Sequence, residues 1–459
     1  MGSGGTHFCL SALARNVVWR AFTPETFRAR SLALDYALIA DFLSGSGQRN
    51  VQRSQHRLRL FWQGVHGDRD DDSVAAKSSA ARLHGHSLDK ISMTTSFRCW
   101  AEIDVEAMRH NLQAIRAMVS NGVRIIAVVK ADAYGHGLPE IARRLDRDVD
   151  LFGVANLVEA QTIRSTGAEA PILILGPALP EERQKIVTEA FIPTVSTLEE
   201  AAGYAECVAV GRRVAIHFVV DTGMGRIGLW EEEADDVLGA IRRMPQLQVS
   251  ALSTHLPVAD EDEKYTARQL QRFRASASRL LAGDEPATVL NSAGVMRFGN
   301  QARPADLVRL GLSLYGVSPL GEFQQRFRPA MTLKTRVTLV RTMGSGRSIS
   351  YGRTFITPRK MTVATLGAGY GDGIDRHLSG RETDVLIRGR RCRLLGRVTM
   401  DQIVVDVSHL EHVEPGEEVV LIGRQGDEEI LATELATKAG TIAWEIFTGI
   451  TKRVVRVYG

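Results

Sequence analysis

Short apolar runs alternate with amphipathic stretches from about residue 97 to about residue 315. The runs are rich in Val, Ile and Leu, have the length of strands, and are mostly followed by stretches with helical spacing. About eight such units over roughly 220 residues are typical of a (β/α)8 barrel, and a doubly wound parallel sheet is the alternative. The predicted strands are 124–130, 151–155, 171–175, 191–195, 214–221, 247–254, 287–292 and 305–311. The predicted helices include 138–146, 157–167 and 266–281.

The pattern changes after about residue 320, where strand-like segments are separated by turns rich in Gly and Pro. These segments predict a second, mostly β domain. One late stretch, 432–450, has the spacing of a helix. We therefore expect an α/β chain with a TIM-type (β/α)8 barrel over 97–320 and a β-rich C-terminal domain over 321–459. The predicted β segments are 331–343, 360–369, 383–396, 402–410 and 417–423.

Residues 1–92 have poor periodicity and include the acidic run 68–72. We expect a low-order, disordered extension, because such a segment buries too little apolar surface to offset the entropy of folding. A basic RNA-binding or targeting arm is an alternative to a dispensable extension. A start codon assigned too far upstream of Met93 would explain the latter.

Composition limits the possible functions. Residues 1–92 hold 12 Lys and Arg against 8 Asp and Glu, which accounts for the whole net charge of +4. The remainder is formally neutral, which disfavours nucleic-acid binding. The four cysteines form no CxxC pair and no zinc-ligand spacing, so we expect a reducing compartment and no metal. No apolar run approaches the ~20 residues of a membrane span, and no signal peptide is evident, so we expect a cytoplasmic protein without a membrane partner.

Lys130 closes the first predicted barrel strand and is followed by the turn 131–137. The loops after barrel strands form the open face of this fold, so functional groups are expected there. At the edge of an apolar core, burial lowers the pKa of a lysine and favours the neutral, nucleophilic amine. From position alone, a surface lysine that begins a loop is an equal alternative.

Ten motifs together resemble one known family. They are WAEIDVEAMRHN (100–111), VVKADAYGHG (128–137), VDTGMGRIG (220–228), LSTHL (252–256), NSAG (291–294), RLGLSLYG (309–316), SYGRTF (350–355), GYGDG (369–373), GRVTMDQ (396–402) and TKRVVRVYG (451–459). Over about residues 97–459 the set closely resembles the alanine racemases, pyridoxal-phosphate enzymes that join a barrel to a β domain. The resemblance implies a homodimer that interconverts L- and D-alanine and supplies D-alanine for peptidoglycan.

Two residues resemble the family's catalytic bases. By this resemblance Lys130 binds pyridoxal 5'-phosphate covalently and is one base. Tyr351 resembles the second base, which the partner subunit supplies. Two bases on opposite faces of a planar carbon explain racemisation, because one removes the α-proton and the other returns a proton from the far side. A tyrosine with an ordinary pKa of ~10 is a poor base at neutral pH, so Tyr351 needs cationic or hydrogen-bonding neighbours.

Five further residues resemble cofactor ligands or their neighbours. Tyr134, Ser292 and the backbone N–H of Gly311 match phosphate ligands. Arg309 matches the residue that hydrogen-bonds the pyridine nitrogen. Because arginine keeps its proton, the ring stays unprotonated and transamination is disfavoured. His255 is expected between Arg309 and the second base. Taken alone, these residues have structural alternatives, such as a packing aromatic, a helix cap or a salt-bridged arginine.

Four residues resemble groups that contact the substrate. Arg226 matches the arginine that binds the substrate carboxylate, a role suited to a planar donor. Met400 and Asp401 match a pair that the partner subunit places at the mouth of the site, with core packing as the alternative for Met400. Tyr370 is expected to line the entrance.

Two positions depart from the family pattern. Many members carry a carbamylated lysine two residues before the aspartate of DTGMGR, where this chain has Val219. Other groups must therefore orient Arg226. Several members have a C-terminal tyrosine where this chain has Lys452, which would hold phosphate or reshape the pocket.

These departures leave the strictness for alanine open, so a broader or serine-directed racemase is an alternative. A non-catalytic pyridoxal-phosphate carrier is the alternative from another class. Such carriers resemble the barrel alone, whereas the β-domain motif SYGRTF is present here. Decarboxylases of this architecture resemble one another at a catalytic Cys, and the corresponding motif here reads VTMDQ.

Overall fold

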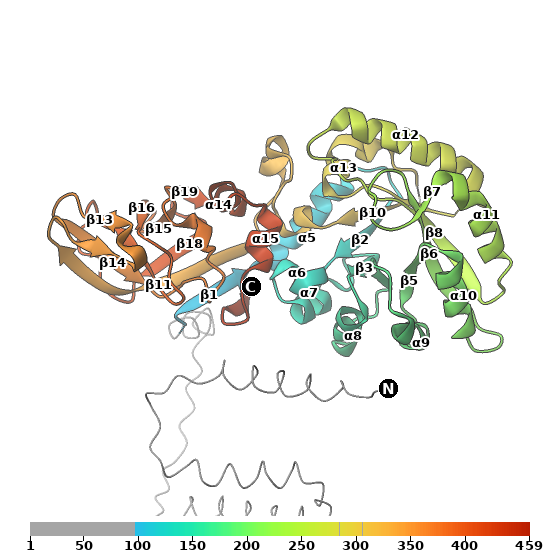
Figure 1. The fold of residues 1–459 in the computed structure, drawn as a ribbon, viewed down its shortest axis with the longest axis horizontal. Coiled ribbons are helices and arrows are strands. Elements are labelled where there is room, and N and C mark those ends of the chain that lie inside the picture. Colours follow the sequence, from blue (N-terminus) through green and yellow to red (C-terminus); the bar gives the residue numbers. More distant parts are fainter. Residues whose placement is uncertain (1–96, 284, 305) are drawn as a thin grey trace, which may run out of the picture. The chain divides into compact units, whose positions relative to one another are not determined.

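The computed structural model describes residues 97–283, 285–304 and 306–459, so the predicted extension 1–92 lies outside the described residues. Eight parallel strands form a barrel (Figure 1). They are β2 (Arg124–Val128), β3 (Leu151–Val154), β4 (Ile172–Ile174), β5 (Ile192–Val195), β6 (Val214–Asp221), β8 (Leu247–Ser253), β9 (Ala287–Thr288) and β10 (Leu307–Leu310). The barrel is closed because β5 pairs with both β4 and β6. Each strand lies within one of the predicted ranges, and the predicted barrel is confirmed.

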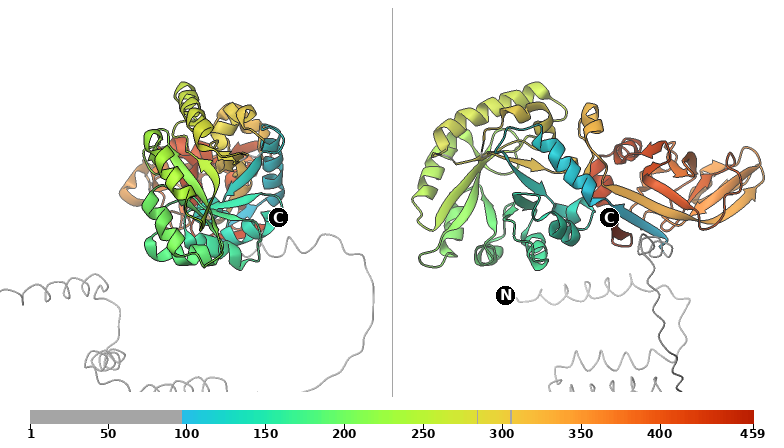
Figure 2. Two further views of the ribbon diagram at one scale, coloured as in Figure 1. Left: turned by 90° about the vertical axis from the view of Figure 1, so that its right-hand side faces the viewer. Right: turned by 180° about the vertical axis from the view of Figure 1, so that it is seen from behind.

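Helices cover the outside of the barrel (Figure 2). They are α7 (Leu138–Leu145), α8 (Leu157–Ser165), α9 (Arg183–Thr188), α10 (Leu198–Glu206), α11 (Glu231–Arg242), α12 (Glu263–Leu280) and α13 (Ser292–Phe298). Capping explains where several of them begin: the Asn156 side chain accepts the amide of Glu159 at α8, and Thr197 and Glu200 form a capping box at α10. In the part of the chain that the structure describes, no helix is long and apolar enough to cross a membrane.

Apolar side chains from five barrel strands form a separate buried cluster. They are Ile126, Leu151, Leu173, Ala251 and Leu307. Such a layer fills a barrel interior by packing and leaves no channel. The polar residues of the barrel can therefore act only where the strands end.

The C-terminal domain is built on a nine-stranded, mostly antiparallel sheet. Its strands are β1 (Cys99–Ile103), β11 (Met331–Met343), β14 (Met361–Leu366), β15 (Asp384–Ile387), β16 (Arg390–Leu395), β17 (Ile403–Asp406), β18 (Glu418–Gln425), β19 (Glu428–Ile430) and β20 (Val455–Tyr458). A mostly β C-terminal domain was predicted. The strand β1 was assigned to the barrel by its place in the sequence, but it pairs with β11 and β20 in this sheet. Its partners lie more than two hundred residues later, so no local pattern could reveal them.

The single helix expected over 432–450 is two helices. They are α14 (Ala432–Ala439) and α15 (Ala443–Thr448). Gly440 follows α14 with φ of 75°, a left-handed conformation that commonly ends helices. The expectation of one continuous helix was therefore wrong, and the break turns α15 toward the barrel, where it packs against the segment after Lys130.

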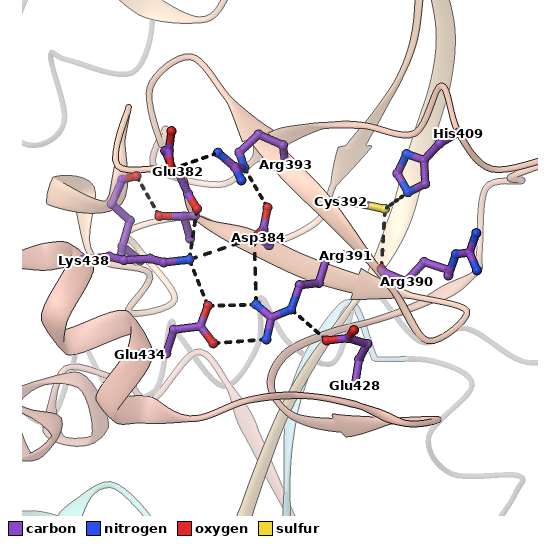
Figure 3. Close-up of polar contacts among 12 residues, drawn as sticks. Glu382, Asp384, Arg390, Arg391, Cys392, Arg393, His409, Glu428, Glu434 and Lys438 are labelled. Atoms are coloured by element: carbon purple, nitrogen blue, oxygen red, sulfur yellow. Dashed lines mark hydrogen bonds and ion pairs between the residues drawn. The ribbon is translucent and has the colours of Figure 1, made fainter. Parts of the chain in front are cut away.

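A cluster of charged side chains lies on β15, β16, α14 and the neighbouring loops (Figure 3). The residues of this β-domain charge cluster are Arg391, Arg393, Lys438, Glu382, Asp384, Glu428 and Glu434. Arg391 lies 2.9 Å from Glu434 and 2.8 Å from Glu428, and hydrogen bonds to these carboxylates raise its pKa. Lys438 Nζ also lies 2.9 Å from Glu434. Each cation of the cluster therefore has carboxylate partners.

Candidate active site

Lys130 begins a turn of left-handed helix. The segment α6 (Lys130–Tyr134) directly follows β2, and its last four residues all have φ between 52° and 55°. A left-handed helical conformation costs on the order of 1–2 kcal/mol per residue other than glycine. The neighbouring structure must therefore hold this turn in place. The sequence predicted a turn here but not its handedness.

Two carboxylates connect the turn to the helices that follow it. Glu159 Oε1 accepts the amide of Ala131 at 2.7 Å. Asp132 Oδ1 accepts the amide of Leu138, the first residue of α7, at 2.8 Å. The turn is thus connected to both of the helices that follow it in sequence. Neither carboxylate was singled out from the sequence.

The buried ring of His136 supports the turn from inside. Its Nδ1 lies 3.1 Å from the carbonyl of Ala133 and 2.8 Å from that of Tyr134, so Nδ1 donates. The ring also contacts Tyr315 and Phe447, with centroids 4.5 and 5.2 Å away. Burial lowers the pKa of His136 to about 4, so the ring is neutral at pH 7. His136 is a structural residue of the turn.

The Lys130 amine makes no hydrogen bond or ion pair with any residue that the structure describes. Partial burial lowers its pKa, the positive charge of Arg226 lowers it further, and Glu159 opposes the shift. The fraction of neutral amine is therefore greater than for an exposed lysine. A partly buried amine with a lowered pKa and no partner is suited to bond to a carbonyl compound.

Arg309 is buried on β10, the strand that pairs with β2, and has no carboxylate partner among the described residues. Its Nη1 donates to the carbonyl and hydroxyl of Thr288, at 2.6 and 2.7 Å. Its Nη2 donates to the carbonyl of Thr254 at 2.6 Å and lies 3.3 Å from His255 Nδ1. Burial and then Arg226 lower the pKa of Arg309 to about 10. Both terminal nitrogens are occupied, and Nε donates to none of the described residues.

The contact with Arg309 determines the tautomer of His255. Arginine only donates, so Nδ1 of His255 accepts and its proton lies on Nε2. Burial and then Arg309 lower the pKa of His255 to about 3, so the ring is neutral. Lys130 and Arg226 contribute to the same shift, which places these groups around His255. We call Lys130, Arg226 and Arg309 the barrel-mouth cations.

Ser292, Gly311 and Tyr134, for which the family resemblance implies a role as phosphate ligands, lie together. The amide of Gly311 donates to Ser292 Oγ at 3.2 Å, and the hydroxyl of Ser313 lies 2.9 Å from the same atom. A Cβ on Gly311 would lie 2.7 Å from the Tyr134 hydroxyl, so only glycine fits there. The Tyr134 ring stacks on Tyr315, with centroids 4.8 Å apart. Three hydroxyl groups and a main-chain amide therefore converge at the end of β10.

The loop that carries Arg226 is held by Asp221 at the end of β6. The carboxylate of Asp221 accepts three amides of 223–225 at 2.7–2.8 Å and that of Arg226 at 3.3 Å. Val219 is buried two residues before it. Asp221 thus orients the loop backbone where a carbamate cannot form. The Arg226 guanidinium has no hydrogen bond or ion pair with a described residue.

The residues expected at the mouth of the site lie on the C-terminal domain and are exposed. Tyr351 is 70% exposed, Met400 51% and Tyr370 41%. Asp401 forms an ion pair of 2.9 Å with Arg453. No hydrogen bond or ring contact among the described residues joins any of these four to Lys130. A single chain therefore does not bring them to the amine.

The position of Lys452 differs from its expected role. Lys452 is exposed in the turn after α15 and makes no hydrogen bond or ion pair with a described residue. Other C-terminal residues approach the turn: a Cβ on Gly135 would lie 2.2 Å from the carbonyl oxygen of Phe447 in α15. Nothing in the structure connects Lys452 to the hydroxyl groups around Ser292.

Sequence reasoning missed several groups of the site. Ser313 and Tyr315 lie inside the motif 309–316, so their hydroxyl groups were visible candidates. The Tyr315 hydroxyl donates to the carbonyl of Val128 at 3.0 Å, which ties the phosphate-ligand region to the end of β2. Glu159 had no comparable signal, because it reads as an ordinary first-turn residue of a helix.

Comparison with known proteins identifies the family. The model of the alanine racemase N-terminal domain matches residues 103–319, and that of the alanine racemase C-terminal domain matches residues 330–458. The chain belongs to the alanine racemase family. It is a racemase, which is an isomerase, and the family resemblance of its motifs is confirmed.

Similar proteins match nearly their whole length. The alanine racemase of Symbiobacterium thermophilum is 44% identical over 370 residues, covering 78% of this chain and 97% of that protein. The alanine racemase of Geobacter sulfurreducens is 40% identical, covering 78% of this chain and 96% of that protein. Among solved structures, the alanine racemase of Clostridium difficile has a TM-score of 0.73 at 34% identity, covering 79% of this chain and 96% of that one. The racemase of Streptomyces lavendulae has the same TM-score at 35% identity, covering 79% and 97%.

Proposed function

We propose that this protein is an alanine racemase that uses pyridoxal 5'-phosphate and two bases, Lys130 and Tyr351. The observation that carries the proposal is the partly buried, unpartnered amine of Lys130, whose pKa is lowered by burial and by the charge of Arg226. The reaction interconverts L-alanine and D-alanine. In the cytoplasm of a cell with peptidoglycan, it supplies D-alanine for the wall.

The residues at the barrel mouth fit pyridoxal phosphate at three points. Tyr134, Ser292 and the Gly311 amide, with the nearby Ser313 hydroxyl, supply donors for a phosphate. Arg309 offers a free Nε donor for a ring nitrogen that carries no proton. Lys130 offers the amine for an aldehyde. The absence of a side chain at Gly311 leaves the Tyr134 hydroxyl free to reach the phosphate.

In the proposed reaction, side chains of the protein transfer the protons. When bound, pyridoxal phosphate supplies an electron-accepting ring that makes the α-hydrogen of an amino acid acidic. Lys130 Nζ removes or returns that proton on one face, because its lowered pKa favours the neutral base. Tyr351 Oη acts on the opposite face. His255 stays neutral and keeps Arg309 in place, so the proton on the arginine is not passed to the ring.

Binding of the amino-acid carboxylate falls to Arg226. Its guanidinium is exposed and unpaired among the described residues, while its backbone is held by Asp221. A planar cation with free donors suits a carboxylate. Met400, Asp401 and Tyr370 would line the entrance.

We infer that Tyr351, Met400, Asp401 and Tyr370 reach the site of a second copy in a homodimer. Their exposure on the C-terminal domain and the lack of contact with their own Lys130 support this arrangement. The test mixes two inactive variants, Lys130→Ala and Tyr351→Phe. A mixed dimer has one site with both bases intact, so mixing should restore roughly a quarter of the wild-type activity. If the mixture stays inactive while the variants exchange subunits, the shared site is wrong.

The cofactor and the reaction are tested together. The protein, loaded with pyridoxal phosphate, should show a visible absorbance band that borohydride traps and that Lys130→Ala lacks. A chiral assay should then detect D-alanine from L-alanine. A bound cofactor without racemisation would favour a non-catalytic carrier, and faster turnover of L-serine than of L-alanine would favour the serine-directed alternative.

Residues 1–92 are proposed to be dispensable, with residues 97–320 and 321–459 as the two catalytic domains. The test is a chain that begins at Met93. It should racemise alanine at the full rate, and a folded but inactive truncation would contradict the proposal.

A further inference from the structure

The last strand of the chain lies directly against the left-handed turn that presents Lys130. β20 pairs in parallel with β1, in a register that aligns Ile103 with Tyr458. Side chains two residues apart on a strand point to the same side. Arg456 and Tyr458 therefore share one face of β20, and both reach the turn.

The two side chains bind consecutive carbonyl groups. Arg456 Nε donates to the carbonyl of Gly135 at 3.0 Å, and the Tyr458 hydroxyl donates to that of His136 at 3.0 Å. A Cβ on Gly137 would lie 1.9 Å from the Tyr458 hydroxyl, so the approach is close enough to require glycine. These contacts hold the end of the turn that lies farthest from β2.

Arg456 is itself held rigidly. Its Nη1 donates to the carbonyls of Thr451 and Val454, both at 2.7 Å, and its Nη2 donates to that of Ile450 at 2.9 Å. The guanidinium thus joins the loop after α15 to the turn, and no carboxylate among the described residues competes for it. A fixed fork of donors is better suited to this than a flexible lysine.

We propose that β20 is a clamp, in which Arg456 and Tyr458 keep residues 131–134 in their left-handed conformation and so position Lys130 and Tyr134 for the cofactor. The strained turn has alternatives of lower energy, so contacts with the surrounding structure must hold it. Glu159 and His136 hold it from within the barrel domain, and Arg456 and Tyr458 hold its far end from the C-terminal domain. Arg456 and Tyr458 are positioning residues, and the consequence for the cofactor rests on the proposed function.

The test compares two conservative variants with the full-length wild-type protein. Tyr458→Phe removes one hydrogen bond and almost no volume. Arg456→Gln removes the guanidinium group and its planar set of donors. Hydrogen–deuterium exchange should become faster in the peptide that contains residues 131–137 and stay unchanged in β11 and β18. The Kd for pyridoxal phosphate should rise about twofold to tenfold in Tyr458→Phe, the range of one lost neutral hydrogen bond.

Tyr204→Phe is the matched control. The Tyr204 hydroxyl is buried in α10 without a hydrogen-bond partner among the described residues, so its removal should change neither exchange in the turn nor the Kd. If Arg456→Gln does not fold, Tyr458→Phe alone decides. Unchanged exchange in the turn overturns the clamp, and faster exchange with an unchanged Kd overturns the positioning role. If wild type binds no pyridoxal phosphate, the proposed function fails, but the exchange comparison still decides the clamp.

Discussion

The barrel mouth and the β-domain charge cluster differ in the partners that surround their arginines. Arg309 is buried, 7% exposed, and bonds only to neutral groups, so its pKa is lowered. Arg391 is less buried and bonds to two glutamates, so its pKa is raised. Among the described residues, Arg309 has no carboxylate partner, whereas Arg391 has Glu428, Glu434 and, at 3.8 Å, Asp384.

This difference suggests separate roles for the two regions: ligand binding for the barrel mouth and stability for the charge cluster. A buried cation without a counter-charge lowers the stability of the protein, so we expect Arg309 to serve a ligand rather than the fold. An exposed ion pair contributes only about 0.2–1 kcal/mol, but a network of several pairs can stabilise a domain. We therefore expect substitutions at the barrel mouth to change catalysis and those in the cluster to change stability alone.

The largest effect should come from replacing a lysine by alanine at the barrel mouth. The same replacement in the charge cluster is the control. Lys130→Ala removes the amine that we propose binds the cofactor and moves the proton, so racemisation should fall on the order of 10⁴-fold or more. Lys438→Ala should leave the rate unchanged, because Lys438 only contacts Glu434, Asp384 and a backbone carbonyl. Both rates are measured by chiral chromatography. Equal losses in the two variants would remove the distinction.

Removal of the proposed second base should affect the reaction of L-alanine and that of D-alanine unequally. Tyr351→Phe should lower the rate roughly 10²–10⁴-fold, since the far face of the α-carbon loses its proton donor and acceptor. Solvent deuterium exchange into alanine should then persist mainly from one enantiomer. Equal residual exchange from L- and D-alanine would count against the assignment.

Reversal of the charge at position 309 should change the outcome of the reaction. Arg309→Glu places a group that can carry a shared proton beside the ring nitrogen, which strengthens the ring as an electron acceptor. The rate of transamination, measured as keto acid released from alanine, should rise several-fold. An unchanged rate of this side reaction would refute the role of Arg309.

In the charge cluster the expected effect is thermodynamic. Arg391→Ala breaks the pairs with Glu428 and Glu434 and should lower the free energy of unfolding by about 1–2 kcal/mol. The loss should shrink in high salt, because exposed pairs are screened. Urea unfolding at two salt concentrations measures it. If Arg391→Ala slowed racemisation and left the free energy of unfolding unchanged, the assignment of stability to the cluster and of catalysis to the barrel mouth would be contradicted.

An effect confined to acid pH is expected inside the barrel. Burial and then Arg309 lower the pKa of His217 to about 3, from 6.5. The unfolded chain therefore takes up a proton that the folded chain does not, so stability is lost as the pH falls from about 6.5 toward 3. In His217→Phe the slope of unfolding free energy against pH should be shallower by up to about 1.4 kcal/mol per unit. Parallel slopes for wild type and variant would exclude this contribution.

Much of the fold was open to prediction because it depends on local patterns. All eight barrel strands lie in the predicted ranges, since buried parallel strands are near-continuous apolar runs. The place of Lys130 at the end of such a run made it a candidate, but only the family resemblance favoured it over a surface lysine. The grouping of Tyr134, Ser292 and Gly311 required the family resemblance, because these residues are far apart in sequence.

Other features left no local signal. The break at Gly440 was missed because apolar spacing continues across it. The pairing of β1 with β11 and β20 depends on strands distant in sequence. The role expected for Lys452 was not supported, because the turn after α15 points it to solvent.

By itself, the sequence determined the order of strands and helices, the family and the amine at the barrel mouth, because apolar spacing and motifs are local properties. Only the tertiary structure decided the handedness of the turn after Lys130 and the groups that hold it. The physical reason is that the left-handed form of residues 131–134 has an energetic cost, which contacts with other parts of the fold must offset. These contacts come from Glu159 and, in our proposal, from Arg456 and Tyr458, which the fold brings from the opposite end of the chain.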